Sequence, residues 1–236
     1  RDILLTHPVT TTSHLKKAQY RVEYFFKIFS SLKLDFPDRE FARLIAQEGD
    51  ATTQEIFLDM GMDKDEEFLI LHPGTSKVER GWHAERFGIL CQKLHKEDGK
   101  RVVLIGTEKE APLLNRIRNY CQPGIIKIVP RVNLRVLARL LGKSRLFIGN
   151  DSGMMHLASM VGVPVLGIFG PGSPDTTGPY MAMEKQEAVT KNFVCSPCKQ
   201  RFFKECKPSP LQKPYCLEDI TVKDVHEAIR RLLERF

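Results

Sequence analysis

The 236-residue chain has the composition of a soluble globular protein, with 42% hydrophobic and 28% charged residues. No apolar run approaches the roughly 20 residues that a membrane-spanning helix needs, and no signal peptide is visible. The net charge of +7 favours acidic partners such as phosphorylated sugars, nucleic acid or an anionic membrane face. Basic motifs interleaved with aromatic residues, as in RNA-binding modules, are missing, so nucleic acid is not expected as a partner.

The first 65 residues lack the regular pattern of the rest. Leu15–Leu32 predicts an amphipathic helix, for which burial against a neighbouring domain is favoured over binding to a membrane surface. Residues 36–65 have the charged composition of a connector, with a short helix expected over Thr53–Met62. Asp63-Lys64-Asp65 matches a metal-binding Asp-x-Asp pattern only superficially, and we expect a solvated turn there.

From residue 66 onward, apolar strand patterns alternate with amphipathic helix patterns. The predicted strands are Phe68–Leu71, Arg101–Ile105, Ile125–Val129, Leu146–Gly149 and Val163–Phe169. The predicted helices are Trp82–His95, Glu110–Cys121, Leu134–Leu141, a helix starting near Ser152, and Thr221–Arg235. Because the strands are apolar without polar alternation, we expect an α/β fold with a parallel sheet covered on both faces. The pattern predicts a doubly wound, Rossmann-like domain over residues 66–190.

Ligands of such sheets bind beyond the carboxyl ends of the strands, and the loops there carry suitable groups. The candidate residues, in strand order, are Thr75, Ser76, Arg80, Glu108, Glu110, Val132, Asp151, Ser152, Gly153 and His156. Hydroxyls, an arginine and a helix N-terminus suit a diphosphate, and a carboxylate suits a ribose diol. The Gly-x-Gly-x-x-Gly fingerprint and a Walker-type lysine loop are missing, which makes a dinucleotide redox enzyme or an NTPase less expected.

The turn after the fourth strand contains Asp151 and Ser152, both good N-cap types, followed by Gly153 and His156. Free backbone N–H groups and the positive end of the helix dipole would favour an anion at this turn. The alternative is an ordinary capped crossover helix without a ligand.

Together these motifs resemble glycosyltransferase family 9, the bacterial lipopolysaccharide heptosyltransferases of the GT-B fold. The matching segments are His72–Ser76 with Trp82, Val102–Glu110, Asp151–His156 and Phe169–Pro171. The resemblance covers most of residues 66–236. It implies that residues 1–35 are the tail of an acceptor-side N-terminal domain that is mostly absent from this chain. Residues 191–236 would form a cysteine-rich segment and a C-terminal helix that crosses back to the other domain.

The resemblance implies inverting transfer of heptose from ADP-heptose to the inner core of lipopolysaccharide. Thr75 and Ser76 would bind the diphosphate, and Arg80 stands where a lysine is usual. Glu110, or Glu108, would bind the ribose, and the backbone of Val132 would contact adenine. The phosphates and sugar would lie between four further residues, namely Asp151, Ser152 (in place of the common Thr), Gly153 and His156.

The resemblance also implies a cytoplasmic enzyme that needs no cofactor and acts at the inner face of the inner membrane. In the family the catalytic base lies near the start of the N-terminal domain, so we assign no catalytic residue in this chain. Asp151 is interpreted as a donor-side or structural residue. The alternatives are a relative that uses another nucleotide sugar for another surface glycan, or a non-catalytic nucleotide-binding module.

Four of the six cysteines, Cys195, Cys198, Cys206 and Cys216, lie within one short segment. The Cys-x-x-Cys pair is compatible with zinc or an iron–sulfur cluster, but the later spacing is not that of a standard zinc ribbon. Metal binding is therefore the minority interpretation, with disulfides and free thiols as the alternatives.

Overall fold

The computed structural model describes residues 55, 57–58, 61–63, 65–130, 133–180, 183–191, 193–195, 198, 202–204 and 206–236. The predicted helix over Leu15–Leu32 and the predicted N-terminal tail over residues 1–35 lie outside the described residues. Val132 also lies outside them.

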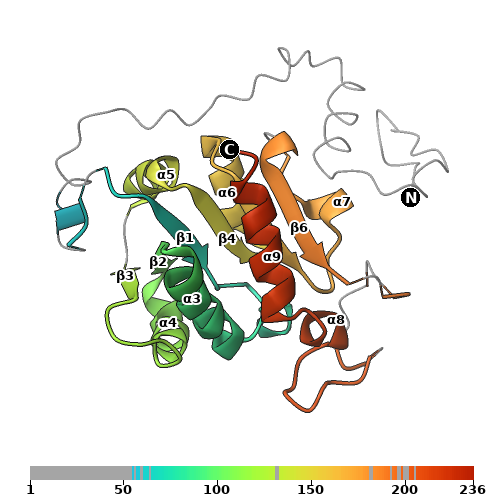
Figure 1. Ribbon diagram of the computed structural model, residues 1–236. Coiled ribbons are helices and arrows are strands. Elements are labelled where there is room, and N and C mark those ends of the chain that lie inside the picture. The colour runs from blue at the N-terminus through green and yellow to red at the C-terminus, as the bar shows by residue number, and fades with distance from the viewer. Residues whose placement is uncertain are drawn as a thin grey trace, which may run out of the picture.

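A six-stranded parallel sheet forms the centre of the molecule (Figure 1). Its strands are β1 (Phe68–His72), β2 (Arg101–Gly106), β3 (Ile126–Pro130), β4 (Leu146–Asn150), β5 (Val165–Phe169) and β6 (Gln186–Thr190). The strand order is β3-β2-β1-β4-β5-β6, which is the order of a doubly wound nucleotide-binding fold. The five predicted strands are confirmed with small shifts at their ends.

Strand β6 was not predicted. Its sequence is polar, and only Val189 among its five residues is buried. As the last strand in the order, it pairs with β5 alone. An edge strand with one buried side chain carries too little apolar pattern to be recognised from sequence.

Helices cover both faces of the sheet. The longer helices are α3 (Ala84–Asp98), α4 (Ala111–Arg118), α5 (Leu134–Lys143), α6 (Gly153–Val161) and α9 (Val222–Leu233), and the short ones are α7 (Pro174–Thr177) and α8 (Tyr215–Glu218). Side chains of α3, α4 and α9 share one apolar core with the sheet, and those of α5 and α6 share the other. In Figure 1, α3 and α9 cross in front of the strands. The doubly wound α/β prediction is confirmed.

The C-terminal helix α9 packs against α3 and the β5–β6 side of the sheet. It begins with a capping box, in which Thr221 Oγ1 accepts from the Asp224 N–H and the Asp224 carboxylate accepts from the Thr221 N–H. Val225, Ile229 and Leu232 are fully buried, so one face of the predicted helix packs on the sheet. The described part of this helix therefore belongs to the sheet domain itself.

A polar network, which we call the α3–α9 seam, joins α3 to the C-terminal segment. It consists of Trp82, His83, Arg86, Asp98, Ser209, Glu218, Ile220, His226 and Arg230. Trp82 is 2% exposed and donates from Nε1 to the Ile220 carbonyl at 2.9 Å, so it lies in the core and anchors this end of the seam. Arg86 donates to the Leu217, Glu218 and Ile220 carbonyls and to the Glu218 carboxylate.

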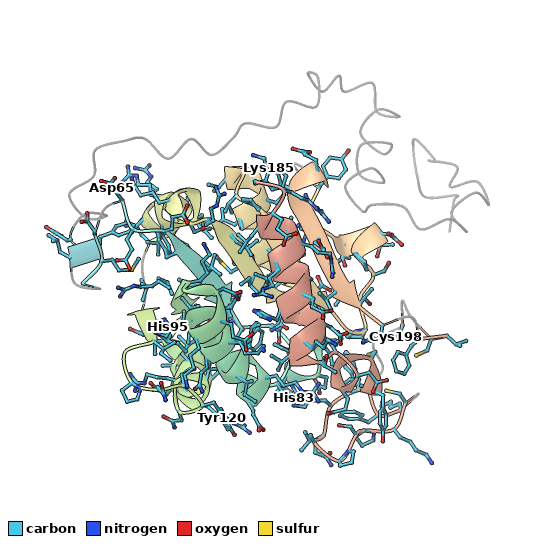
Figure 2. All side chains as sticks on the ribbon, viewed as in Figure 1. Asp65, His83, His95, Tyr120, Lys185 and Cys198 are labelled. Atoms are coloured by element: carbon cyan, nitrogen blue, oxygen red, sulfur yellow. The ribbon has the colours of Figure 1, made fainter. Side chains whose placement is uncertain are left out.

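Because all strands are parallel, their amino ends lie at one edge of the sheet and their carboxyl ends at the other. Figure 2 shows Asp65 and Lys185 near the amino ends of the strands, and His83 and Cys198 toward the opposite end. Asp63 and Asp65 are exposed, and the Asp63 N–H donates to Glu66 at 3.3 Å, which agrees with the predicted solvated turn. The candidate ligand-binding residues follow the carboxyl ends, so they gather at one edge.

Candidate functional site

The winding of the sheet reverses between β1 and β4. Strands β2 and β3 continue on one side of this pair, and β5 and β6 continue on the other. In open α/β sheets the usual ligand position is a crevice at the carboxyl edge where the winding reverses, which here lies between the loops that follow β1 and β4. We call this place the edge crevice.

Arg80 and Asp151 form an ion pair across the edge crevice. Arg80 ends the 3-10 turn Val78–Arg80 after β1, and Asp151 directly follows β4. Their side chains are 19% and 8% exposed, respectively, so both charges are largely removed from water. Gly172, in the loop after β5, packs against the same carboxylate, because a Cβ there would lie 2.4 Å from Asp151 Oδ2.

The N-terminus of α6 differs from the predicted cap. Ser152, not Asp151, occupies the N-cap position, and its side chain makes no capping hydrogen bond. Of the two N-cap types at this turn, Ser152 takes the cap position, and the Asp151 carboxylate pairs with Arg80 instead. Ser152 Oγ is buried without a hydrogen-bond partner, and Gly153 is exposed with open space where a Cβ would stand.

His156 lies one turn further along α6 and is half-buried. Burial lowers the pKa of its imidazole, although the Asp151 charge opposes this shift. At neutral pH the ring is therefore neutral and has both a hydrogen-bond donor and an acceptor. With the uncapped helix start beside it, this turn offers donors to an anion.

Glu110 is the carboxylate of the second loop that faces the crevice. Its Oε2 accepts from the Thr107 N–H at 2.7 Å and from Thr107 Oγ1 at 2.9 Å, closing a capping box. Its Oε1 lies 3.6 Å from His72 Nε2, which is an ion-pair distance rather than a hydrogen bond. The contact with His72, followed by the Thr107 hydrogen bonds, outweighs burial and lowers the pKa of Glu110 to about 2. Glu108 is exposed in the same turn, so Glu110 is the better ribose candidate of the two.

The first and second loops touch at Gly74. A Cβ at Gly74 would lie 1.7 Å from Glu110 Oε1 and 2.9 Å from His72 Cε1. Only glycine lets the loop after β1 approach the Glu110 carboxylate this closely. Further along that loop, Thr75 Oγ1 donates to the Lys77 carbonyl at 2.6 Å, and Ser76 is exposed.

Unsatisfied polar atoms gather at the edge crevice. Within the described ranges, three buried side-chain atoms lack a hydrogen-bond partner: His72 Nδ1, Arg80 Nε and Ser152 Oγ. All three belong to the loops or strand ends around the β1–β4 reversal. Buried polar groups are normally paired, so these three atoms mark the β1–β4 reversal as the candidate place for a ligand or ordered water.

The structure thus brings together Arg80, Asp151, Ser152, Gly153 and His156, with Thr75, Ser76 and Glu110 on the adjoining loops. It adds residues that sequence reasoning missed, namely His72, Thr107 and Asn150. His72 and Thr107 lie inside the recognised motifs, and Asn150 directly precedes one, which was the available signal. The contacts of His72 and Asn150 depend on parts of the chain distant in sequence and have no local pattern.

None of the four clustered cysteines forms a disulfide bond in the structure. Cys195 and Cys206 are exposed, and Cys216 is buried. Burial, and then the neighbouring thiols of Cys198, Cys195 and Cys206, raises the pKa of Cys216 to about 12. No group of three or more His, Cys, Asp or Glu side chains in the described part of the chain is arranged to hold a metal ion.

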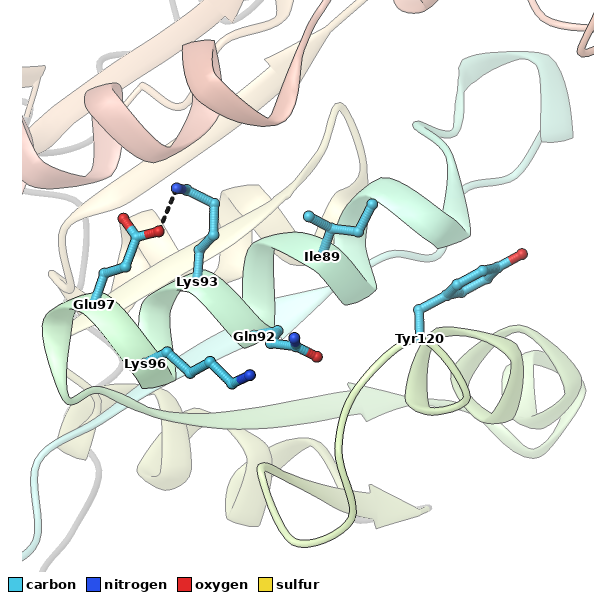
Figure 3. Close-up of a pocket in the computed structure, with 6 residues that line it drawn as sticks. All are labelled: Ile89, Gln92, Lys93, Lys96, Glu97 and Tyr120. Atoms are coloured by element: carbon cyan, nitrogen blue, oxygen red, sulfur yellow. Dashed lines mark hydrogen bonds and ion pairs between the residues drawn. The ribbon is translucent and has the colours of Figure 1, made fainter.

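A second surface hollow lies away from the edge crevice. Figure 3 shows this pocket of about 200 Å³ along α3, with a Lys93–Glu97 ion pair at 2.5 Å. It is lined by Ile89, Gln92, Lys93, Lys96, Glu97 and Tyr120. None of the candidate ligand-binding residues lines it, so it is separate from the candidate site.

Among the described helices, none has the length and apolar content needed to span a bilayer.

Comparison with known proteins agrees with the geometry. The family model described as glycosyltransferase family 9 (heptosyltransferase) matches residues 8–207. Lipopolysaccharide heptosyltransferase 1 of Pseudomonas aeruginosa is 26% identical over 75% of this chain and 50% of its own length. Lipooligosaccharide heptosyltransferase 2 of Campylobacter jejuni is 30% identical over 70% of this chain and 51% of its own length.

Among solved structures, the E. coli heptosyltransferase WaaC with ADP has a TM-score of 0.59 and 21% identity. The alignment covers 92% of this chain and 57% of WaaC, and it supports the GT-B type of fold. The chain spans about half the length of the curated relatives that it matches. The family model covers most of the chain, and the chain therefore belongs to glycosyltransferase family 9, the heptosyltransferase family.

Proposed function

We propose that this chain is the donor-binding part of an enzyme that transfers heptose from ADP-heptose to the inner core of lipopolysaccharide. The observation that carries the proposal is the set of unsatisfied buried polar atoms around the Arg80–Asp151 pair at the edge crevice. Relatives named as lipopolysaccharide heptosyltransferases support the acceptor class. The WaaC structures with ADP and with ADP-2-deoxy-2-fluoro heptose support the donor.

The proposed donor pose follows from the charges. The diphosphate lies at the start of α6 and beside Arg80, where the guanidinium, the free N–H groups and Ser152 Oγ face it. The ribose lies toward Glu110, which stays ionised at neutral pH because its pKa is about 2. Val132 remains the proposed adenine contact on the third loop.

The reaction places its largest electrostatic demand on the leaving group. As an acceptor hydroxyl attacks the anomeric carbon, negative charge grows on the departing ADP. Arg80, the hydroxyls of Thr75 and Ser76, and the α6 dipole stabilise that charge. The proton of the acceptor hydroxyl goes to a base in the N-terminal, acceptor-side domain, to which residues 1–35 contribute the tail. The protein is proposed to act in the cytoplasm, on the inner face of the inner membrane.

Nucleotide binding tests the donor assignment directly. Thermal unfolding of the chain with ADP, UDP or GDP should show stabilisation by ADP alone, about 2.7 kcal/mol at a concentration 100 times the dissociation constant. Stabilisation by UDP or GDP but not ADP would replace this proposal with a family relative that uses another nucleotide sugar. No stabilisation by any nucleotide would remove donor binding altogether.

Heptose transfer by the full-length protein tests the catalytic half of the proposal. We expect release of ADP from ADP-heptose that depends on a lipopolysaccharide core acceptor. Binding of ADP without such turnover would indicate a nucleotide-binding module.

Zinc or an iron–sulfur cluster at the four cysteines stays a separate prediction, on which no step above depends. Metal analysis of the purified protein tests it. A stoichiometric metal that is lost in Cys198→Ser would support it.

A further inference from the structure

One buried side chain holds both ends of the loop that carries the proposed diphosphate ligands. Asn150, the last residue of β4, is 0% exposed. Its Nδ2 donates to the Pro73 carbonyl at 2.7 Å, and its Oδ1 accepts from the Trp82 N–H at 3.0 Å. The loop between these two anchors contains Thr75, Ser76 and Arg80.

The amide of asparagine matches these two backbone groups. A buried carbonyl needs a donor and a buried N–H needs an acceptor, and one primary amide supplies both. An aspartate would face the Pro73 carbonyl with a second acceptor, and an aliphatic side chain would leave both backbone groups unpaired. The orientation of the amide follows from its two partners.

The next residue fixes the loop at a third point. Asp151 pairs with Arg80, and Trp82 is further held by its Nε1 hydrogen bond to Ile220. Asn150 thus holds the loop at Pro73 and at Trp82, and Asp151 holds it at Arg80. Order imposed before a ligand arrives reduces the entropy lost on binding.

We propose that Asn150 is a positioning residue, which holds the Pro73–Trp82 loop in the shape that binds the donor diphosphate. This inference rests on the proposed function. It assigns Asn150 no contact with the ligand, so its effect should depend on the phosphates and not on the nucleoside.

Asn150→Ala, with ADP and adenosine as probes, separates positioning from a general loss of structure. In calorimetric titrations the variant should bind ADP about tenfold more weakly, while its affinity for adenosine stays within about twofold. The matched control is Ser144→Ala, because Ser144 is also buried and its hydroxyl donates to the Leu141 carbonyl at the other end of β4. The control should leave both affinities unchanged.

Amide hydrogen exchange gives a readout without nucleotide. In the free wild-type protein the Trp82 amide should exchange as slowly as those of the central strands, and Asn150→Ala should accelerate it while the strands stay protected. If the alanine variant does not fold, the wild-type measurement still decides, because rapid exchange at Trp82 would overturn the inference.

The outcomes distinguish this inference from the proposed function. Failure of the wild type to bind ADP would overturn both. Binding of ADP by the wild type, together with an equal loss of ADP and adenosine affinity in Asn150→Ala or no loss at all, would overturn the positioning role alone.

Discussion

The edge crevice and the α3–α9 seam both contain buried or partly buried arginine, histidine and carboxylate side chains, but they differ in how completely these groups are hydrogen-bonded. In the seam, Glu218 accepts hydrogen bonds from Arg86 and Ser209 and contacts His83, while Asp98 pairs with His226 and Arg230. None of the unpartnered buried side-chain atoms among the described residues lies in the seam; all three are in the crevice. An unmet buried group costs about 1–3 kcal/mol, so the seam contributes to stability whereas the crevice retains hydrogen-bonding capacity for a ligand.

The largest effect on stability is expected at Arg86. Arg86→Ala should lower the free energy of unfolding by about 3 kcal/mol, because three backbone carbonyls and the Glu218 carboxylate lose their donor. Urea denaturation measures this loss, and ADP affinity at a temperature where the variant is folded should stay unchanged.

Arg230→Ala is the matched control for the seam. Arg230 also pairs with a carboxylate of α3, but its side chain is 53% exposed, so we expect less than about 1 kcal/mol. A similar loss in both variants would contradict the view that burial within the seam gives Arg86 its importance.

Arg80 should affect ligand binding in addition to stability, because Arg80→Ala also leaves the largely buried Asp151 carboxylate without its partner. Arg80→Ala should weaken ADP binding about 30-fold, which corresponds to about 2 kcal/mol, because it removes the charge that faces the diphosphate. Arg80→Lys keeps a cation and should stay within about fivefold. Calorimetric titration measures both, and Arg118→Ala on the exposed side of α4 serves as the control. Equal ADP affinity in Arg80→Ala and the wild type would remove the guanidinium from the ligand site.

The smallest effect is expected from Glu110 in acid. Its pKa is lowered to about 2, so its carboxylate contributes stability above the unfolded value of 4.5 that is lost as pH falls toward 2. Glu110 is partly exposed, and solvent screening reduces the contribution to about 1 kcal/mol. Between pH 6 and pH 3, the unfolding free energy of the wild type should fall by about that much more than that of Glu110→Gln. If the unfolding free energies of the two proteins change with pH in parallel, the His72 and Thr107 contacts do not stabilise the ionised carboxylate.

The sequence predicts most of the sheet because the central strands are continuously apolar. Leu69, Ile70 and Leu71 in β1 and Phe147 and Ile148 in β4 are all fully buried, and a run of this kind has few other interpretations. Strand β6 was missed because its exposed residues resemble a loop. The predicted start of the last helix at Thr221 is also correct, because Thr221 is the N-cap residue of α9.

Sequence reasoning identified the edge loops but not the pairs that form across them. Local chemistry makes Asp151 a good N-cap type, yet Arg80, 71 residues earlier, is its partner. Asn150 directly precedes the recognised motif and has no predicted role, since Pro73 and Trp82 reach it only when β1 and β4 pair. Such contacts depend on the sheet register, which no local pattern encodes.

Strands β1 and β4 are neighbours in the sheet but are separated along the chain by two strands and three α-helices. During synthesis, the loop that carries Arg80 therefore leaves the ribosome well before the Asn150 and Asp151 side chains that fix it. A nascent chain that ends before β4 has half of the edge crevice and nothing to hold its loop. The proposed binding of a nucleotide can thus begin only after the β4–α6 turn has emerged and joined β1.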